Sequence, residues 1–447
     1  MTASMTTTST SIESLSDLAG YADRRAADGP DWLRALRQRA AAQFAEHGLP
    51  TTKHEEWRFT NVRPIAQATF APAEDAPANV SSGDVARFDF ADLDASLLVF
   101  VNGQYADHLS DPPTGVTVVP LSQAIESHAD IVRPQLQRIA ERDIDGFARL
   151  NTAALEDGVF IHVTREQTVD RPIRLLHIAS PGKPFMTHPR NVIVAEAGAE
   201  VTVIERYVSL GEGVYFTNAV TQIDAGDNAH VAHYLLEQES MQAFNVNTLH
   251  IRQGRDTQVE SHSVLLGGAL VRNNVWPLLN GPGGDCVING LYIGNDAQHL
   301  DNFMHVEHAK PHCESRQFYK GILDDKSHGV FRGRIVVHNE AQKTDAKQTN
   351  ANLLLSDSAE IDTKPKLEIY ADDVKCTHGA TIGQIDEDAI FYLRSRGIHK
   401  DDARAMMVFA FAGESLDRMS VTPIRDALTR ELVRQLPSSA FVETILE

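Results

Sequence analysis

From Val159 to about Gly383 the chain repeats one arrangement, in which short β-forming segments alternate with small polar corners. Examples of the segments are VFIHV, IRLLHI, EVTVIERYVS, VINGLYIG and KLEIY; examples of the corners are DAGDNA, GPGGDC, LDDKSHG and LSDSAE. The Gly, Asp, Asn and Ser of the corners tolerate tight turns and left-handed backbone. Roughly 220 residues of this kind exceed an ordinary β-sandwich but suit stacked turns. We therefore expect a mainly β fold with a β-helix-like solenoid core.

The flanking regions carry helical patterns and divide the chain into three expected domains. Residues 1–158 form a helical and mixed N-terminal domain, whose Ser/Thr-rich residues 1–10 we expect to be disordered. Residues 159–384 form the solenoid, and residues 385–447 form a C-terminal helical domain. A solenoid has two ends with unpaired backbone, so we expect the flanking domains to cap these ends or to serve as interfaces.

Composition narrows the class of protein. The chain carries 61 acidic and 41 basic residues, and this net charge of −20 argues against nonspecific nucleic-acid binding. Its three cysteines are too few and too scattered for a disulfide framework. The N-terminus lacks the pattern of a secretory signal, and no run of about 18 apolar residues is present. We expect a cytoplasmic protein that binds neither nucleic acid nor membrane.

Several catalytic and cofactor motifs are missing from the sequence. It contains no G-x-x-x-x-G-K-[ST] loop, no Rossmann glycine fingerprint and no G-x-S-x-G elbow. It also contains no C-x-x-C pair, so one copy cannot supply a four-cysteine metal or iron–sulfur site. We expect neither nucleotide hydrolysis nor a stably bound cluster in this chain alone.

The segment HLDNFMHVEHAKPHC is the densest cluster of possible metal ligands. It holds His299, Asp301, His305, His308, His312 and Cys313. Alternation along a strand separates His305 from His308, whereas His308 and His312 could align, and Pro311 bends the chain. We favour surface and corner histidines satisfied by hydrogen bonds over a dedicated metal site.

A second cluster surrounds Cys376 and His378. These residues are two apart, so on a strand they share a face, close to Asp372 and Asp373. Two ligands are too few for a closed metal site but could form half of a site shared with another chain. A polar turn at the end of the solenoid is an equally good interpretation.

The run NLLLSDSAEIDTKPKLEIYADDVKCTHGATIGQIDEDAIFYLRSRGI resembles the signature of the SufB/SufD family of the SUF iron–sulfur cluster assembly system. The resemblance extends to HAKPHCESRQFYKGIL, LVFVNGQYADHLS and TTKHEEWRFTN, and so covers most of the chain. It implies a parallel β-helix with a C-terminal helical domain that docks the SufC ATPase. Leu393 stands where the SufB branch has a cysteine, which favours the SufD branch.

The resemblance also implies partners and site residues. The chain would be a non-catalytic scaffold that pairs with a SufB paralogue and binds SufC, with iron or an iron–sulfur cluster held transiently at the subunit interface. His378 would contribute to that site, and Cys376 has less support from the resemblance. The last solenoid rung would be the interface, with Lys364, Lys366, Glu368 and Tyr370. The expected ATPase-docking residues are Phe391, Tyr392, Arg394, Arg396, Gly397, Met406 and Phe409.

Two alternatives remain at this stage. A SufB-like scaffold could act as a homodimer and bind a cluster without a paralogue. A β-helix could also be a polysaccharide-processing enzyme, which would need carboxylates and basic residues aligned in a groove. No such ladder is evident in the sequence, and this alternative ranks last.

Overall fold

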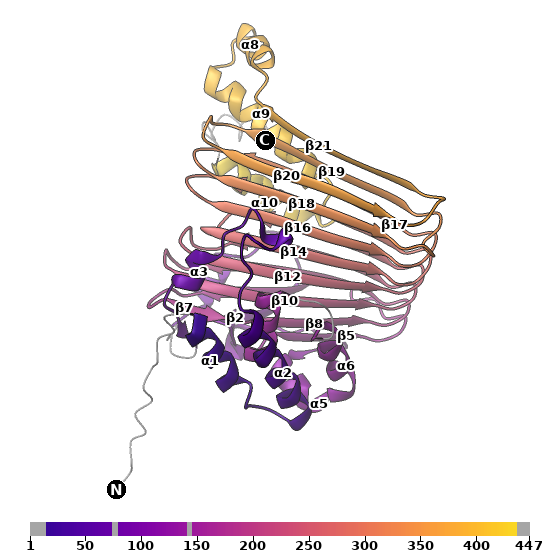
Figure 1. Ribbon diagram of the computed structural model, residues 1–447. Coiled ribbons are helices and arrows are strands. Elements are labelled where there is room, and N and C mark those ends of the chain that lie inside the picture. The colour runs from indigo at the N-terminus through magenta and orange to yellow at the C-terminus, as the bar shows by residue number, and fades with distance from the viewer. Residues whose placement is uncertain (1–14, 74–78, 141–144, 436–447) are drawn as a thin grey trace.

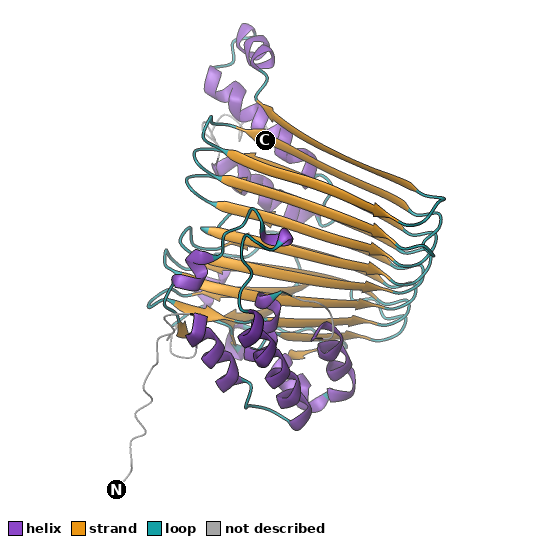
Figure 2. Ribbon diagram, in the orientation of Figure 1, coloured by secondary structure: helices purple, strands orange, loops and turns teal. Residues whose placement is uncertain are grey.

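The computed structural model describes residues 15–73, 79–140 and 145–435. The disorder expected for residues 1–10 lies outside these described residues. The chain winds into a solenoid in which successive turns place one strand in each of two sheets (Figures 1 and 2). The predicted fold class is therefore confirmed.

The two sheets collect alternate strands of the chain. The first sheet contains β4 (Thr117–Pro120), β5 (Val159–Val163), β8 (Arg190–Ala195), β10 (Tyr215–Ala225), β12 (Phe244–Gln253), β14 (Leu270–Leu279), β16 (His299–His308), β18 (His328–Val337) and β20 (Glu360–Ile369), with β1 (Ala71–Pro72) and β7 (Phe185–Thr187) at its side. The second sheet contains β3 (Gln104–Tyr105), β2 (Ser96–Val101), β6 (Ile173–Ala179), β9 (Glu200–Ser209), β11 (His230–Gln238), β13 (Gln258–Leu265), β15 (Asp285–Gly294), β17 (Glu314–Leu323), β19 (Asp345–Leu354) and β21 (Lys375–Gln384).

Pairing between successive turns is parallel throughout the solenoid. The antiparallel pairs β2–β3 and β4–β5 lie at its N-terminal end, where β2 also extends the second sheet beside β6. Asn102 and Gly103 form the tight turn between β2 and β3, with φ of 46° and 80°. Strands that precede Val159 therefore belong to the same two sheets as the core.

The corners between strands use left-handed backbone at stacked positions. Asn228, Asp256, Asp296 and Asp325 have φ between 49° and 58°, and Gly198 and Gly283 have φ of 71° and 76°. Asn, Asp and Gly adopt this region at the lowest steric cost. His312 and Lys343 adopt it as well, so the corner geometry tolerates residues that the sequence pattern does not single out.

The solenoid interior is filled by matching large and small side chains in adjacent turns. Gly290 pairs in register with Tyr319, and Tyr292 pairs with Gly321. A Cβ atom at either glycine would overlap the neighbouring tyrosine ring, so each glycine makes room for one buried ring.

Short helices cover the N-terminal end of the solenoid (Figure 1). They are α1 (Leu15–Arg25), α2 (Asp31–His47), α3 (Arg63–Gln67), α4 (Ser82–Ala86), the 3₁₀ helix η3 (Asp107–Leu109), α5 (Leu121–Ser127), α6 (Ala129–Ala140) and α7 (Gly146–Ala154). The 3₁₀ helix η1 (Glu55–Trp57) lies further along the first sheet, where Glu55 contacts Lys364 of β20. Helices α1 and α2 are separate, because Gly29 (φ 96°) and Pro30 interrupt the helical pattern between them. Phe44 and Phe147 join the core between these helices and the first sheet.

In the part of the chain that the structure describes, three helices follow β21: α8 (Glu387–Ser395), α9 (Lys400–Leu416) and α10 (Thr422–Gln435). The Asp386 carboxylate caps α8 by accepting hydrogen bonds from the backbone N–H groups of Asp388 and Ala389, as its acidic start predicts. Helix α9 packs on β15 and β17 of the second sheet. Helix α8 projects beyond the last turn of the solenoid (Figures 1 and 2). Among the described residues, no helix combines the length and apolar composition needed to cross a bilayer.

Candidate site at the open end of the solenoid

Strands β20 and β21 form the last turn of the solenoid, and each is the outermost strand of its sheet. Within the described residues, no strand covers their outer edges. Apolar side chains are correspondingly exposed on this turn, including Ile369 (40%), Tyr370 (63%) and Ile382 (52%). Helices α9 and α10 pack on the side of the solenoid and leave this end uncovered.

The two open edges differ in their backbone donors. The N–H groups of Glu360 and Tyr370 bond to the preceding turn, so the odd-numbered residues of β20 direct theirs outward. Pro365 lies in this outward set and has no N–H. On β21, Lys375 bonds inward, so the even-numbered residues face outward, and none of them is proline. The outer edge of β21 is therefore continuous in donors, whereas Pro365 interrupts that of β20.

Cys376 and His378 occupy β21, on the same face as predicted. Their partners in register are Ala346 and Gln348 of β19, both of which are buried in the solenoid interior. Cys376 is half-buried and packs against this interior, whereas His378 is exposed because no further turn covers it. Partial burial raises the pKa of the Cys376 thiol, so the thiol is a poor metal ligand until something draws off its proton.

The acidic residues beside this pair do not complete a metal site. Asp373 forms an ion pair with Lys343, and its backbone N–H donates to Gln342 Oε1 at 3.0 Å. Asp372 is exposed in the corner before β21. Across the described ranges, no group of three or more His, Cys, Asp and Glu side chains is arranged to hold a metal ion. Cys376 and His378 thus offer at most part of a ligand set.

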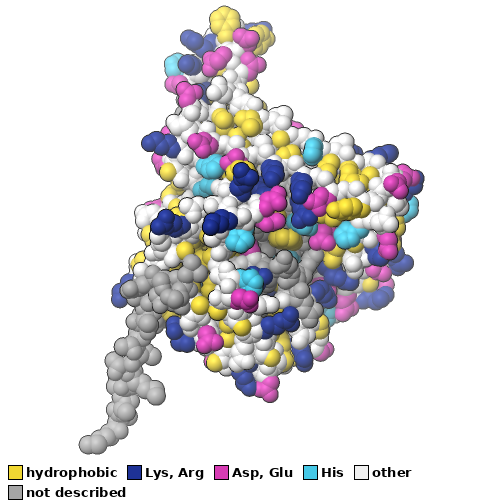
Figure 3. Space-filling model, viewed as in Figure 1, with side chains coloured by type: hydrophobic (Ala, Val, Ile, Leu, Met, Phe, Trp, Pro, Cys, Tyr) yellow, Lys and Arg dark blue, Asp and Glu magenta, His cyan; other side chains and the backbone are white. Residues whose placement is uncertain are grey.

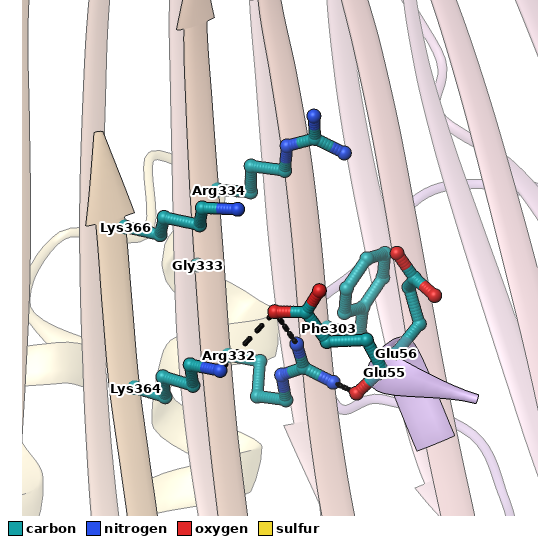
Figure 4. A pocket seen from close by; sticks show the side chains of 8 residues that line it. All are labelled: Glu55, Glu56, Phe303, Arg332, Gly333, Arg334, Lys364 and Lys366. Carbon is teal, nitrogen blue, oxygen red and sulfur yellow. Dashed lines mark hydrogen bonds and ion pairs between the residues drawn. The ribbon is translucent and has the colours of Figure 1, made fainter. Parts of the chain in front are cut away.

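The outward face of β20 carries charges that are already paired. Lys364 Nζ lies 3.2 Å from Glu55 Oε1, and Lys366 Nζ lies 2.7 Å from Glu368 Oε1. Glu368 also accepts a hydrogen bond from Arg334 at 2.7 Å, and Arg334 and Lys366 together lower the pKa of Glu368 to about 2. Figure 4 shows Arg332, Arg334, Lys364 and Lys366 beside Glu55 and Glu56. The predicted interface residues therefore sit on a charge network that an N-terminal segment helps to form.

The histidines between residues 299 and 313 are dispersed. The ring of His299 lies 2.9 Å from Thr60 Oγ1, His305 stacks on Trp276 with ring centroids 4.7 Å apart, and His308 points into the solenoid, 2.8 Å from Ser315 Oγ. His312 occupies a corner, and Cys313 is buried. His308 and His312 therefore do not align as the sequence allowed.

A cavity of about 480 Å³ lies between the N-terminal helices and the first sheet. It is lined by Trp57 and Asp145 from the N-terminal domain and by Trp276 and His305 from the sheet, among others. Figure 3 shows this face of the molecule, with histidine and charged side chains interspersed across it. The sequence pattern gave no sign of this cavity, because its walls are far apart in the chain.

The predicted ATPase-docking residues have very different exposures. Phe391 (72%) and Tyr392 (56%) project from α8, and hydrophobic side chains are visible at that tip in Figure 3. The Arg396 guanidinium carbon lies 4.8 Å from the centroid of the Tyr392 ring. Arg394 and Arg396 are otherwise solvent-facing, and Gly397 ends the helical segment with φ 89°. Met406 is half-buried, and Phe409 packs within the helical domain.

Fold and site define a β-solenoid that ends in an uncovered turn carrying an imidazole and a thiol. Residues 177–411 match the family described as "SUF system FeS cluster assembly, SufBD core domain", and residues 21–175 match "SufBD protein N-terminal region". The chain belongs to this SufBD family of the SUF iron–sulfur cluster assembly system.

Similar proteins occur in several bacteria. The chain is 36% identical over 407 residues to the iron–sulfur cluster assembly protein SufD of Escherichia coli, covering 90% of this chain and 93% of that protein. It is 34% identical to a SufBD family protein of Synechocystis, covering 88% of each. It is 26% identical to SufD of Bacillus subtilis, covering 91% of this chain and 94% of that protein. The predicted resemblance is confirmed.

Proposed function

We propose that this chain is a non-catalytic scaffold subunit that pairs with a SufB paralogue through the open end of its solenoid. The observation that carries the proposal is the uncovered last turn. Three of the six exposed large hydrophobic side chains among the described residues, Ile369, Tyr370 and Ile382, lie on this turn. Clustered exposed apolar side chains and open strand edges are both typical of surfaces that another protein covers.

The edge of β21 is the better docking edge for a partner strand. It presents uninterrupted backbone donors from Cys376 to Gln384, whereas Pro365 interrupts the edge of β20. A strand added at β21 would extend the second sheet by main-chain hydrogen bonds. The predicted interface residues Lys364, Lys366, Glu368 and Tyr370 would then lie beside this seam, on the neighbouring sheet.

Cluster assembly would take place at the seam, with iron and sulfur as cargo. His378 would supply an imidazole ligand from the open face, and Cys376 a thiolate after loss of its proton. Two side chains cannot close a tetrahedral site, so the remaining ligands would come from the SufB paralogue. A ligand set divided between two chains is consistent with the absence of a complete metal site among the described residues.

The SufC ATPase would bind the projecting helix α8. Phe391 and Tyr392 form an exposed aromatic pair beside Arg394 and Arg396, and aromatic and arginine side chains are enriched at binding hot spots. Phe409 is half-buried and packs within the helical domain, which argues that it supports this surface rather than contacts the ATPase directly. ATP-driven movement of SufC would reach the seam through the short link between β21 and α8.

We place this function in the cytoplasm. Cys286, Cys313 and Cys376 are all free thiols, and the first two are buried. Buried thiols without disulfides suit a reducing compartment. Family membership offers no support for the polysaccharide-processing alternative, while the SufB-like homodimer uses the same open edges and is distinguished by experiment.

The test is anaerobic reconstitution of the chain alone and in complex with SufB and SufC homologues. We expect cluster formation only in the complex, and its loss when His378 is replaced in the variant His378→Ala. His338→Ala is the control, because His338 is also exposed but lies in the corner after β18. A cluster on the isolated chain would favour the homodimer, and full assembly by His378→Ala would remove His378 from the site.

A further inference from the structure

One column of inward-facing side chains ends at His378. Gln317 of β17 pairs in register with Gln348 of β19, and Gln348 pairs with His378 of β21. All three lie on the same face of the second sheet in consecutive turns. The column therefore carries two amides and then an imidazole, which is the first of the three to reach the open end.

The two glutamines form a buried amide ladder. Gln348 Nε2 donates a hydrogen bond to Gln317 Oε1 at 2.7 Å, and the two side chains are 1% and 2% exposed. Gly333 of the facing sheet provides the room, since a Cβ atom there would overlap the Gln348 amide. The Gln348 amide is thus confined on one side by Gln317 and on another by the backbone of β18.

The oxygen of the Gln348 amide accepts no hydrogen bond from the described residues. This Oε1 atom is buried, and in this structure it makes no hydrogen bond to the His378 ring. His378 is nevertheless the registered neighbour of Gln348 in the following turn, and its side chain is exposed, with no further turn of the described residues packed over it. A neutral imidazole always carries one N–H donor, and a buried acceptor is strongly favoured to find one.

We propose that Gln348 is the positioning residue for His378: the exposed His378 ring turns toward Gln348, whose amide oxygen accepts one ring N–H and so selects one tautomer. The other ring nitrogen then keeps its lone pair and faces the open end, ready to bind a metal ion. Histidines that bind metals ordinarily hold their second N–H in this way. The metal-binding part of the inference rests on the proposed function, whereas the tautomer selection does not.

The test is the ring ¹⁵N NMR spectrum of the isolated chain, labelled at histidine and recorded without metal at one fixed pH. The His378 signals are assigned by their absence from the His378→Ala variant. Gln348→Met keeps a similar shape but removes the acceptor. We expect it to shift the His378 tautomer ratio about three- to tenfold toward that of free imidazole, as expected for loss of one hydrogen bond.

Two further variants make the result decisive. Gln348→Glu keeps an acceptor and should retain or strengthen the wild-type tautomer, since Gln317 can turn its amide over to donate to the new carboxylate. Gln253→Met changes another fully buried amide far from His378 and should leave the His378 signals unchanged. Should Gln348→Met fail to fold, the Gln348→Glu spectrum decides: a shift toward the free-imidazole ratio overturns the proposal.

Unchanged His378 signals in a folded Gln348→Met variant would also overturn the proposal. Cluster assembly in the reconstituted complex separates this failure from failure of the proposed function. A shifted tautomer in Gln348→Met, together with normal assembly by His378→Ala, would keep Gln348 as the positioning residue and remove His378 from metal binding. An unshifted tautomer with assembly lost only in His378→Ala would do the reverse.

Discussion

The Nζ atom of Lys364 lies 3.2 Å from the Oε1 atom of Glu55, although the two residues are 309 positions apart in the chain. This contact joins the last turn of the solenoid to a segment that leaves the N-terminal helices. The hydrogen bond from Lys364 lowers the pKa of the Glu55 carboxyl. Further along the same segment, Trp57 and Thr60 contact Arg272 and Asp301, which form a buried ion pair on the first sheet.

Replacing Trp57 should destabilise the whole chain. The Trp57 side chain is 3% exposed, and the Arg272 guanidinium carbon lies 3.8 Å from its ring centroid. We expect Trp57→Ala to lower the free energy of unfolding by about 3–5 kcal/mol, the usual cost of removing a buried aromatic ring. Urea denaturation measures this change. Glu55→Gln is the control and should cost at most about 1 kcal/mol, because the Glu55 ion pair is exposed.

Gly290 should not tolerate a methyl group. A Cβ atom there would overlap the Tyr319 ring, and overpacking a rigid core typically costs about 1–3 kcal/mol. We expect Gly290→Ala to be destabilised by that amount, and Tyr319→Leu to relieve part of the cost in the double variant. A double-mutant cycle from denaturation curves measures the coupling. Additive effects would contradict the packing argument, and Gly379→Ala, at a site with open space, should be nearly neutral.

Glu368 should make the last turn sensitive to acid. Its pKa in the folded chain is about 2, because Arg334 and Lys366 favour the carboxylate, against an ordinary value of 4.5. A lowered folded-state pKa stabilises the fold above the unfolded pKa, and this contribution disappears as the pH falls toward 2. Glu368→Gln should therefore be less stable than wild type at neutral pH, and the difference should shrink on acidification.

The comparison of the two chains in urea from about pH 6 to about pH 3.5 isolates this carboxyl from the many others that titrate. Glu360→Gln, at the start of the same strand, provides the matched control. A Glu368→Gln difference that stayed constant over this range would show that the charge network contributes nothing to stability.

Helix α8 should carry the affinity for SufC. We expect the double variant Phe391→Ala and Tyr392→Ala to bind the ATPase at least tenfold more weakly, as hot-spot truncations do, with an unchanged melting temperature because both rings are exposed. Calorimetric titration measures the binding. Met241→Ala removes another exposed hydrophobic side chain from a distant site, and equal weakening by this control would argue against a specific surface.

Proline substitutions on β21 should separate docking from folding. The N–H of Ala380 faces the open edge, whereas that of Thr381 faces β19. Ala380→Pro should therefore prevent association with SufB while the isolated chain stays folded, and Thr381→Pro should lower the melting temperature by breaking an internal ladder bond. Size-exclusion chromatography and thermal denaturation measure the two effects. Normal association of Ala380→Pro would move the docking edge to β20.

Much of the architecture could be predicted because it depends on local signals. Alternating apolar residues and Gly, Asp and Asn corners specify stacked turns, and Asn228 and Asp256 adopt the left-handed backbone that such corners require. The spacing of Cys376 and His378 places them on one face of a strand. Asp386 marks the start of α8 in the same local way. The disorder expected for residues 1–10 stays a prediction, because these residues lie outside the part of the chain that the structure describes.

The sequence by itself determined the solenoid, the shared face of Cys376 and His378 and the helical end of the chain, because each follows from residues close together. Only the tertiary structure decided that Gln348 lies beneath His378, that Glu55 reaches Lys364 and that the β21 edge is uninterrupted. These relationships depend on the register between turns and on how distant segments dock. Turn lengths vary without a strict period, so local patterns do not specify which residues of neighbouring turns will face each other.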